Sequence, residues 1–122
     1  RDPKVIWDSD SELWRDAGAV GGNIEFYGSK TLKQWYKLSS FGKNVGAHGG
    51  VWECPDLFPV WISETGVKKW VLIVSINPGA YNGGSGTQYF IGEFDGRRFR
   101  MDQEFGAHLA RNARVNNQPA CW

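Results

Sequence analysis

Hydrophobic residues along this chain occur in short stretches that turn-forming residues interrupt, a pattern typical of β-strands. Lys68–Ile76 ends at an Asn-Pro-Gly turn, and Thr87–Phe94 is a second stretch of the same kind. An Asp-Gly pair separates Thr87–Phe94 from the segment 97–101, so we expect a β-hairpin there. Further strands are expected at Pro3–Trp7, Asn23–Ser29 and Leu57–Ile62. The pattern therefore predicts an all-β protein.

Three segments interrupt this strand pattern. Residues 31–38 are too short for a helix and predict a turn that leads into a strand. Asn77–Gly86 is rich in Gly, Asn and Ser and predicts a long loop, where functional residues often lie. Residues 102–115 predict a short amphipathic helix, because apolar side chains recur at every fourth position: Phe105, Leu109 and Ala113.

Two weakly similar units make up most of the chain, at about residues 1–46 and 47–101, and a tail of unclear structure follows at 102–122. Each unit opens with a carboxylate shortly before a proline, Asp2 in the first and Glu53 in the second, and continues as short strands. Repeated units of about four strands are typical of β-propellers, whose innermost strands line a central channel. That arrangement would bring Asp2 and Glu53 together. A meander of packed sheets is the alternative that the pattern leaves open.

Composition narrows the classes of function. The 122 residues carry a net charge of +1 without a run of like charges, which argues against a nucleic acid or a membrane surface as partner. No apolar run approaches the roughly 20 residues of a membrane span. Aromatic residues make up 15% of the chain, and aromatic rings commonly bind sugars. The two cysteines, Cys54 and Cys121, allow one disulfide at most and leave the redox compartment open.

Glu53 is the residue with the most suggestive surroundings, because Trp52 precedes it and Cys54 and Pro55 follow it. Such neighbours remove water from a carboxyl group and raise its pKa, as a general acid requires. A second carboxylate across a sugar completes the machinery of glycoside hydrolysis, and Asp2 is the candidate. The alternative is that Glu53 is a solvated residue of an ordinary strand.

Three motifs together carry a resemblance to a known family. Arg-Asp-Pro-Lys-Val at 1–5, Gly-Gly-Val-Trp-Glu-Cys-Pro-Asp-Leu-Phe at 49–58, and the stretch from Lys69 to Gly96 resemble the β-fructofuranosidases of glycoside hydrolase family 32. This family includes levanases, inulinases and invertases. The resemblance covers Arg1 to about Arg98 and implies a five-bladed β-propeller, of which this chain would be an internal segment of about two four-stranded antiparallel blades. It also implies a retaining mechanism on fructose-containing sugars.

The resemblance assigns roles to individual residues. Glu53 would be the general acid/base, and Asp2 would bind fructose hydroxyls and stabilise the transition state. Arg1 would bind sugar hydroxyls beside Asp2, and Cys54 would line the same subsite. Trp52 would contribute to the substrate-binding site and screen Glu53 from water.

Other expectations concern cofactors, partners and location. We expect no cofactor and no metal site, since neither His48 nor His108 has a further ligand at metal-binding spacing, and His48 fits a structural role in its loop. The expected partner is a fructose-containing oligosaccharide or polysaccharide, with no nucleic acid and no membrane. The resemblance favours a secreted or periplasmic location over a cytoplasmic one. Without its neighbouring blades, the chain is expected to associate with them or with itself.

One departure from the family concerns the nucleophile, which is an Asp in a Trp-Met-Asn-Asp-Pro motif. The chain contains no such motif, and we interpret Asp8 and Asp10 as part of a turn. The chain would therefore supply two of three catalytic carboxylates. A non-catalytic carbohydrate-binding propeller and an inactive fragment stay open as alternatives, as do sucrose, inulin or levan as substrate and endo or exo cleavage.

A second departure is Leu13–Gly22, where the family has an apolar strand after the tryptophan. Arg15 and Asp16 would place two charges in a blade interior, at a cost of several kcal/mol if they are unpaired. One explanation is a base inserted after the Trp14 codon, which would convert Trp-Val-Met-Leu into Trp-Arg-Asp-Ala-Gly. A genuine charged edge strand is the alternative.

Overall fold

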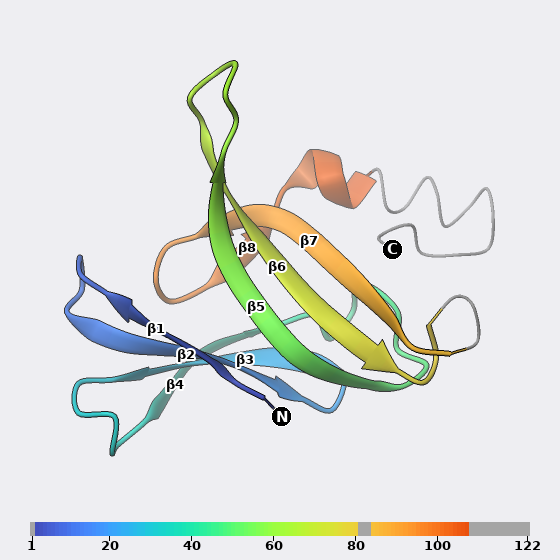
Figure 1. Cartoon of the computed structure of the whole chain (residues 1–122), viewed down its shortest axis with the longest axis horizontal. Helices are drawn as coiled ribbons and strands as arrows, with labels where there is room; N and C mark the ends of the chain where they lie inside the picture. The colour runs from blue at the N-terminus through green and yellow to red at the C-terminus, as the bar shows by residue number, and fades with distance from the viewer. Residues whose placement is uncertain (1, 81–83, 108–122) are drawn as a thin grey trace.

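The computed structural model describes residues 2–80 and 84–107, which form two four-stranded antiparallel sheets (Figure 1). The first sheet contains β1 (Lys4–Asp8), β2 (Leu13–Val20), β3 (Asn23–Ser29) and β4 (Tyr36–Phe41). The second contains β5 (Val51–Trp61), β6 (Lys68–Asn77), β7 (Gly86–Phe94) and β8 (Phe99–Met101). Strand order follows chain order in both sheets, so each is a meander. The all-β prediction is confirmed.

Most of the local predictions are also confirmed. The hairpin of β7 and β8 is present, with Phe94 paired to Phe99 across the Asp-Gly turn. The segment 31–38 turns before it enters β4 at Tyr36. A helical turn occupies residues 103–107, and the rest of the helix predicted for 102–115 lies outside the described residues. Within the described part of the chain, no helix has the length and apolar character needed to cross a membrane.

The hydrophobic core lies where the two sheets face each other. Strands place alternate side chains on opposite faces, and Leu72, Val74 and Ile76 of β6 are fully buried in this way. Phe26 of β3 and Phe90 of β7 bring aromatic rings to the same layer. Each such side chain contributes about 1.5–3 kcal/mol through removal of its surface from water, so the packing of the sheets fixes their relative placement.

Strand β2 corrects one interpretation of the sequence. It pairs with β1 on one side and with β3 on the other, so the charged segment is an interior strand and the edge-strand alternative is wrong. Alternation separates the two charges. Arg15 is 5% exposed and points into the core side with Ala17, whereas Asp16 lies on the opposite face of the sheet.

Candidate active site

Asp2 and Cys54 meet where the start of β1 approaches β5 (Figure 1). The Cys54 thiol Sγ donates a hydrogen bond to Asp2 Oδ2 at 3.4 Å, although the two residues lie 52 positions apart in the chain. The Lys4 ammonium and the Asp56 carboxylate form an ion pair of 3.5 Å between the same two strands. The structure thus brings Asp2 beside the residue that follows Glu53.

The backbone is strained on both sides of this contact. Asp2 has a φ of 50° and Cys54 a φ of 49°, values that residues with a side chain rarely adopt. Such conformations cost of order 1–3 kcal/mol each and persist where the surrounding structure enforces them, often at functional sites. Among the described residues, positive φ without glycine occurs at two further positions only, Glu12 and Leu32. Two of these four positions are therefore the partners of the contact between Asp2 and Cys54.

A β-bulge in β5 accompanies the strain. Glu53 pairs with Ser75 and Asp56 with Ile73, so β5 advances three residues where β6 advances two. Pro55 lies inside this bulge, where its missing N–H leaves no ladder hydrogen bond unmade. Bulges re-aim the side chains next to them, and this one directly follows Glu53.

Trp52 lies in the core and is 0% exposed, a placement that differs from the sugar-binding role expected for it. Its indole Nε1 donates to the Ala47 carbonyl at 2.8 Å, and its backbone N–H donates to the Gly21 carbonyl at 2.8 Å. Because successive strand side chains point to opposite faces, Trp52 and the half-buried Glu53 project in opposite directions. Trp52 therefore anchors the strand that carries Glu53.

Close backbone contacts fix the start of β5. A Cβ atom on Gly50 would collide with the Pro78 carbonyl, and one on Gly79 would collide with the backbone of Gly49. The loop after β6 therefore lies directly on the residues that precede Trp52. His48 belongs to the same region, where its ring stacks on Trp52 at 5.1 Å and its Nε2 lies 2.8 Å from the Val45 carbonyl. These contacts agree with the structural role expected for His48.

The predicted site residue Arg1 lies outside the described residues, as do His108 and Cys121. The sugar-binding role of Arg1 stays a prediction. Between residues 2 and 107, apart from the gap at 81–83, no group of three or more His, Cys, Asp or Glu side chains could hold a metal ion.

Comparison with known sequences identifies the family. The sequence model of the glycosyl hydrolases family 32 N-terminal domain matches residues 1–113. The chain belongs to glycosyl hydrolase family 32. A Bacillus subtilis levanase is 52% identical over 103 residues, which are 84% of this chain and 15% of the levanase. An Aspergillus niger extracellular exo-inulinase is 43% identical over 108 residues, which are 85% of this chain and 20% of the inulinase. The family 32 chain thus spans 15% to 20% of the length of these relatives.

Solved structures of related enzymes resemble this chain in fold as well as in sequence. A fructofuranosidase from Schwanniomyces occidentalis complexed with fructose has a TM-score of 0.77 and 42% identity, covering 84% of this chain and 20% of that one. The Aspergillus awamori exo-inulinase has a TM-score of 0.77 and 42% identity, covering 85% and 21%. The two sheets of this family 32 chain are therefore arranged as in the fructofuranosidases.

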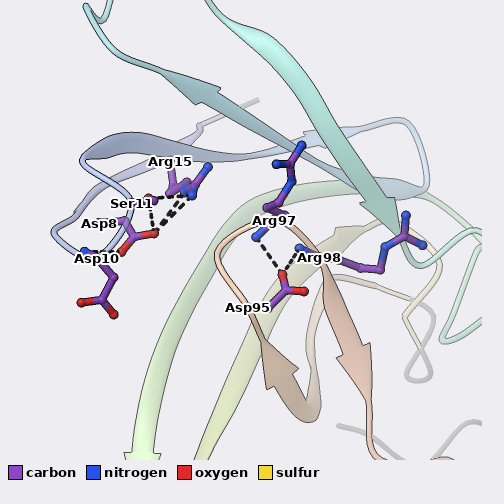
Figure 2. Close-up of polar contacts among 7 residues, drawn as sticks. All are labelled: Asp8, Asp10, Ser11, Arg15, Asp95, Arg97 and Arg98. Carbon is purple, nitrogen blue, oxygen red and sulfur yellow. Dashed lines mark hydrogen bonds and ion pairs between the residues drawn. The ribbon is translucent and has the colours of Figure 1, made fainter.

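An ion pair that sequence reasoning missed lies at the other end of β1. Arg15 Nη2 and Nε lie 3.2 and 3.3 Å from Asp8 Oδ2, and Ser11 Oγ accepts from Nη2 at 2.7 Å (Figure 2). Asp10 lies in the turn after β1, as predicted, whereas Asp8 is the last residue of β1. The register pairs Arg15 with Ile6, and strand alternation could have placed Arg15 on the inner face near Asp8.

Two carboxyl groups of the first sheet have opposite pKa changes. Burial raises the pKa of Asp8, but hydrogen bonds from Ser11, the Asp10 N–H and Arg15 outweigh it and hold the pKa below its ordinary value. Burial raises the pKa of Asp16, whose Oδ1 has no hydrogen-bond partner within the described residues. In this family 32 chain, Arg15 on the inner face of β2 therefore has a counter-ion, whereas the Oδ1 atom of Asp16 on the outer face has no hydrogen-bond partner within the described residues.

Proposed function

We propose that this chain forms part of the catalytic domain of a retaining β-fructofuranosidase, with Glu53 as general acid/base and Asp2 as transition-state stabiliser. The observation that carries the proposal is the hydrogen bond of 3.4 Å from Cys54 to Asp2, because it joins the two motifs that resemble the catalytic motifs of family 32. The strained backbone at both residues and the bulge after Glu53 support it.

In the proposed reaction, Glu53 is protonated at the start and gives its proton to the glycosidic oxygen as the bond to the anomeric carbon breaks. Asp2 stays ionised, accepts hydrogen bonds from fructose hydroxyls and stabilises the positive charge that develops on the ring. In the second step, the Glu53 carboxylate removes a proton from the attacking water. Cys54 and Arg1 line the fructose subsite, and Trp52 acts from the core by positioning β5.

The nucleophile of this mechanism must come from another part of the catalytic domain, because the chain contains no Trp-Met-Asn-Asp-Pro motif. The relatives are much longer than this chain, which spans 15% of the levanase. The double displacement therefore requires a nucleophile from outside these 122 residues, which supply the proposed general acid/base and the proposed transition-state stabiliser.

We propose that the two sheets are successive blades of a five-bladed β-propeller. The first strand of each sheet carries or follows the proposed catalytic carboxylate, Asp2 before β1 and Glu53 in β5. The contact between Asp2 and Cys54 agrees with two innermost strands that meet at one channel. The units about 1–46 and 47–101 would each be one blade.

The proposed substrate is a fructan or sucrose. The similar proteins are named levanase, exo-inulinase and invertase, and one structural relative from Schwanniomyces occidentalis is complexed with fructosylnystose. An extracellular location is proposed as well, since the related inulinase is named as extracellular. The second candidate function is carbohydrate binding without catalysis.

A chimeric enzyme tests the proposal. Residues 1–101 of this chain replace the matching segment of the Bacillus subtilis levanase, to which the chain is 52% identical. The chimera should hydrolyse levan, and Glu53→Gln should lower kcat by about 10²–10⁴-fold, the usual contribution of a general acid. Glu64→Gln is the matched control, because Glu64 is exposed in the turn after β5. A Glu53→Gln chimera as active as the Glu64→Gln control would refute the assignment.

A further inference from the structure

A pocket of ≈ 480 Å³ lies between the two sheets, beside the turn from β1 to β2. Its lining comes from that turn, from Pro59 of β5, from Lys68 and Trp70 of β6, and from the turn after β7. Asp2 and the pocket residue Asp8 lie at opposite ends of β1, which puts roughly 20 Å between them at the rise of an extended chain. The pocket is therefore distinct from the proposed active site.

We propose that this pocket binds a neutral oligosaccharide, a second length of the fructan chain on which the proposed active site acts. The choice of fructan rests on the proposed function. The choice of a carbohydrate rests on the pocket itself, which has the volume of an ordinary ligand site, an aromatic wall and several hydrogen-bonding groups.

The aromatic wall consists of Trp7, Trp70 and Phe94. Trp7 is 49% exposed and is held by an edge contact with Trp14 at 5.2 Å, so a fixed indole surface faces solvent. Trp70 packs against Phe94 at 5.3 Å, and the Lys68 ammonium lies 5.5 Å from the centroid of the Trp70 ring. Rigid indole rings offer large amphipathic surfaces at low entropic cost, which suits the apolar faces of sugar rings.

Charged groups of both signs line the polar side of the pocket. Asp8, Asp10 and Asp95 contribute carboxylates, and Arg15 and Lys68 contribute cations. The carboxylates would repel a phosphate, and Arg15 and Lys68 would repel a cation. Hydroxyl groups, in contrast, can donate hydrogen bonds to the carboxylates and accept them from Arg15 and Lys68. The mixture therefore favours a neutral, polyhydroxylated ligand over a charged one.

The pocket is preformed, because its two turns brace each other. Asp8 and Arg15 form an ion pair of 3.2 Å. A Cβ atom on Gly96 would lie 3.0 Å from Asp8 Oδ2 and 3.2 Å from Arg15 Nη2, so the turn after β7 rests on this pair. Asp95 fixes that turn by accepting from the N–H groups of Arg97 and Arg98 at 2.9 and 2.8 Å (Figure 2). Asp10 points away from the ion pair and leaves its carboxylate for a ligand.

Nuclear magnetic resonance of the tryptophan indole N–H groups tests the proposal on the chain as it stands. The chain contains 7 tryptophans, and the signals of Trp7 and Trp70 are assigned from Trp7→Phe and Trp70→Phe variants. Titration with fructosylnystose should move these two signals and leave the signal of the buried Trp52 in place. Trp7→Ala should weaken binding by about tenfold, as for a central aromatic contact. Asp10→Ala, in an exposed turn, should weaken it without loss of fold.

The controls separate this site from the proposed active site. Tyr36→Ala should bind as the unchanged chain does, since Tyr36 is 46% exposed on β4 and outside the pocket lining. Glu53→Gln and Asp2→Asn should leave the Trp7 shift unchanged. Unmoved Trp7 and Trp70 signals, or Trp7→Ala and Asp10→Ala variants that both bind as tightly as the unchanged chain, would overturn the pocket and leave the proposed function intact. An inactive levanase chimera with normal Trp7 shifts would overturn the proposed function instead.

Discussion

Removal of Asp8 is expected to destabilise the chain strongly, because it leaves a buried arginine without its counter-ion. The Arg15 side chain is 6% exposed and that of Asp8 is 23% exposed, and their charged atoms are 3.2 Å apart. At this distance, and with an effective dielectric constant of about 20, the Coulomb attraction is about 5 kcal/mol before desolvation is subtracted. Loss of one partner of a buried pair costs about 3–5 kcal/mol. Since Asp8 keeps some contact with water, we expect Asp8→Ala to cost about 3 kcal/mol.

A double-mutant cycle measures this effect. Urea unfolding followed by tryptophan fluorescence gives the free energy of unfolding for the unchanged chain, Asp8→Ala, Arg15→Met and the double variant. The double variant should be about as stable as Arg15→Met, because neither contains the buried guanidinium that Asp8→Ala leaves without a counter-ion. Asp10→Ala on the same turn is the control and should change stability by less than about 0.5 kcal/mol. An Asp8→Ala variant as stable as the Asp10→Ala control, or strictly additive single effects, would refute the reasoning.

Three further predictions concern the described residues. The pKa of folded Asp8 lies below its ordinary value of 3.8. The contribution of the Asp8 carboxylate to stability should therefore be complete above pH 3.8 and be lost as the pH falls through the lower pKa of the folded state. Urea midpoints measured against pH should show this loss, and Asp8→Asn should reduce it. Gly50→Ala should lower the free energy of unfolding by about 1–3 kcal/mol, because the new Cβ atom would collide with the Pro78 carbonyl. Gly18→Ala should lower it less, since the nearest atom to its Cβ is 3.9 Å away. Equal urea midpoints for the two variants would contradict this prediction. The chain should self-associate in sedimentation experiments because apolar side chains such as Trp61, at 64% exposure, face solvent, and a monodisperse monomer would contradict that.

The strands could be predicted from the sequence because the signals that define them are local. Lys68–Ile76 and Thr87–Phe94 are short apolar stretches that end at turns, and they form β6 and β7 nearly as expected. The repeat and the family resemblance predicted that Asp2 and Glu53 lie close together, and the structure shows Asp2 in contact with Cys54, the residue that follows Glu53. These features depend on local pattern or on family resemblance, and neither requires knowledge of packing.

The remaining features depend on register and packing, which the sequence does not state. Trp52 was expected near the sugar, yet alternation directs it into the core, opposite to Glu53. The bulge after Glu53 requires a comparison of β5 with β6, and no local pattern marks it. The partner of Arg15 emerges only when the pairing of β1 with β2 is known, since Asp8 lies seven positions earlier in the chain.

The role of Glu53 as the proton donor is the central claim, and the dependence of rate on leaving group tests it most directly. In the levanase chimera, kcat/KM is measured for sucrose and for an aryl β-fructofuranoside whose leaving group needs no proton. If Glu53 is the general acid, Glu53→Gln should lower kcat/KM for sucrose by about 10²–10⁴-fold and leave the first step on the aryl substrate nearly unchanged. An equal loss on both substrates, or no loss on sucrose, would contradict the claim.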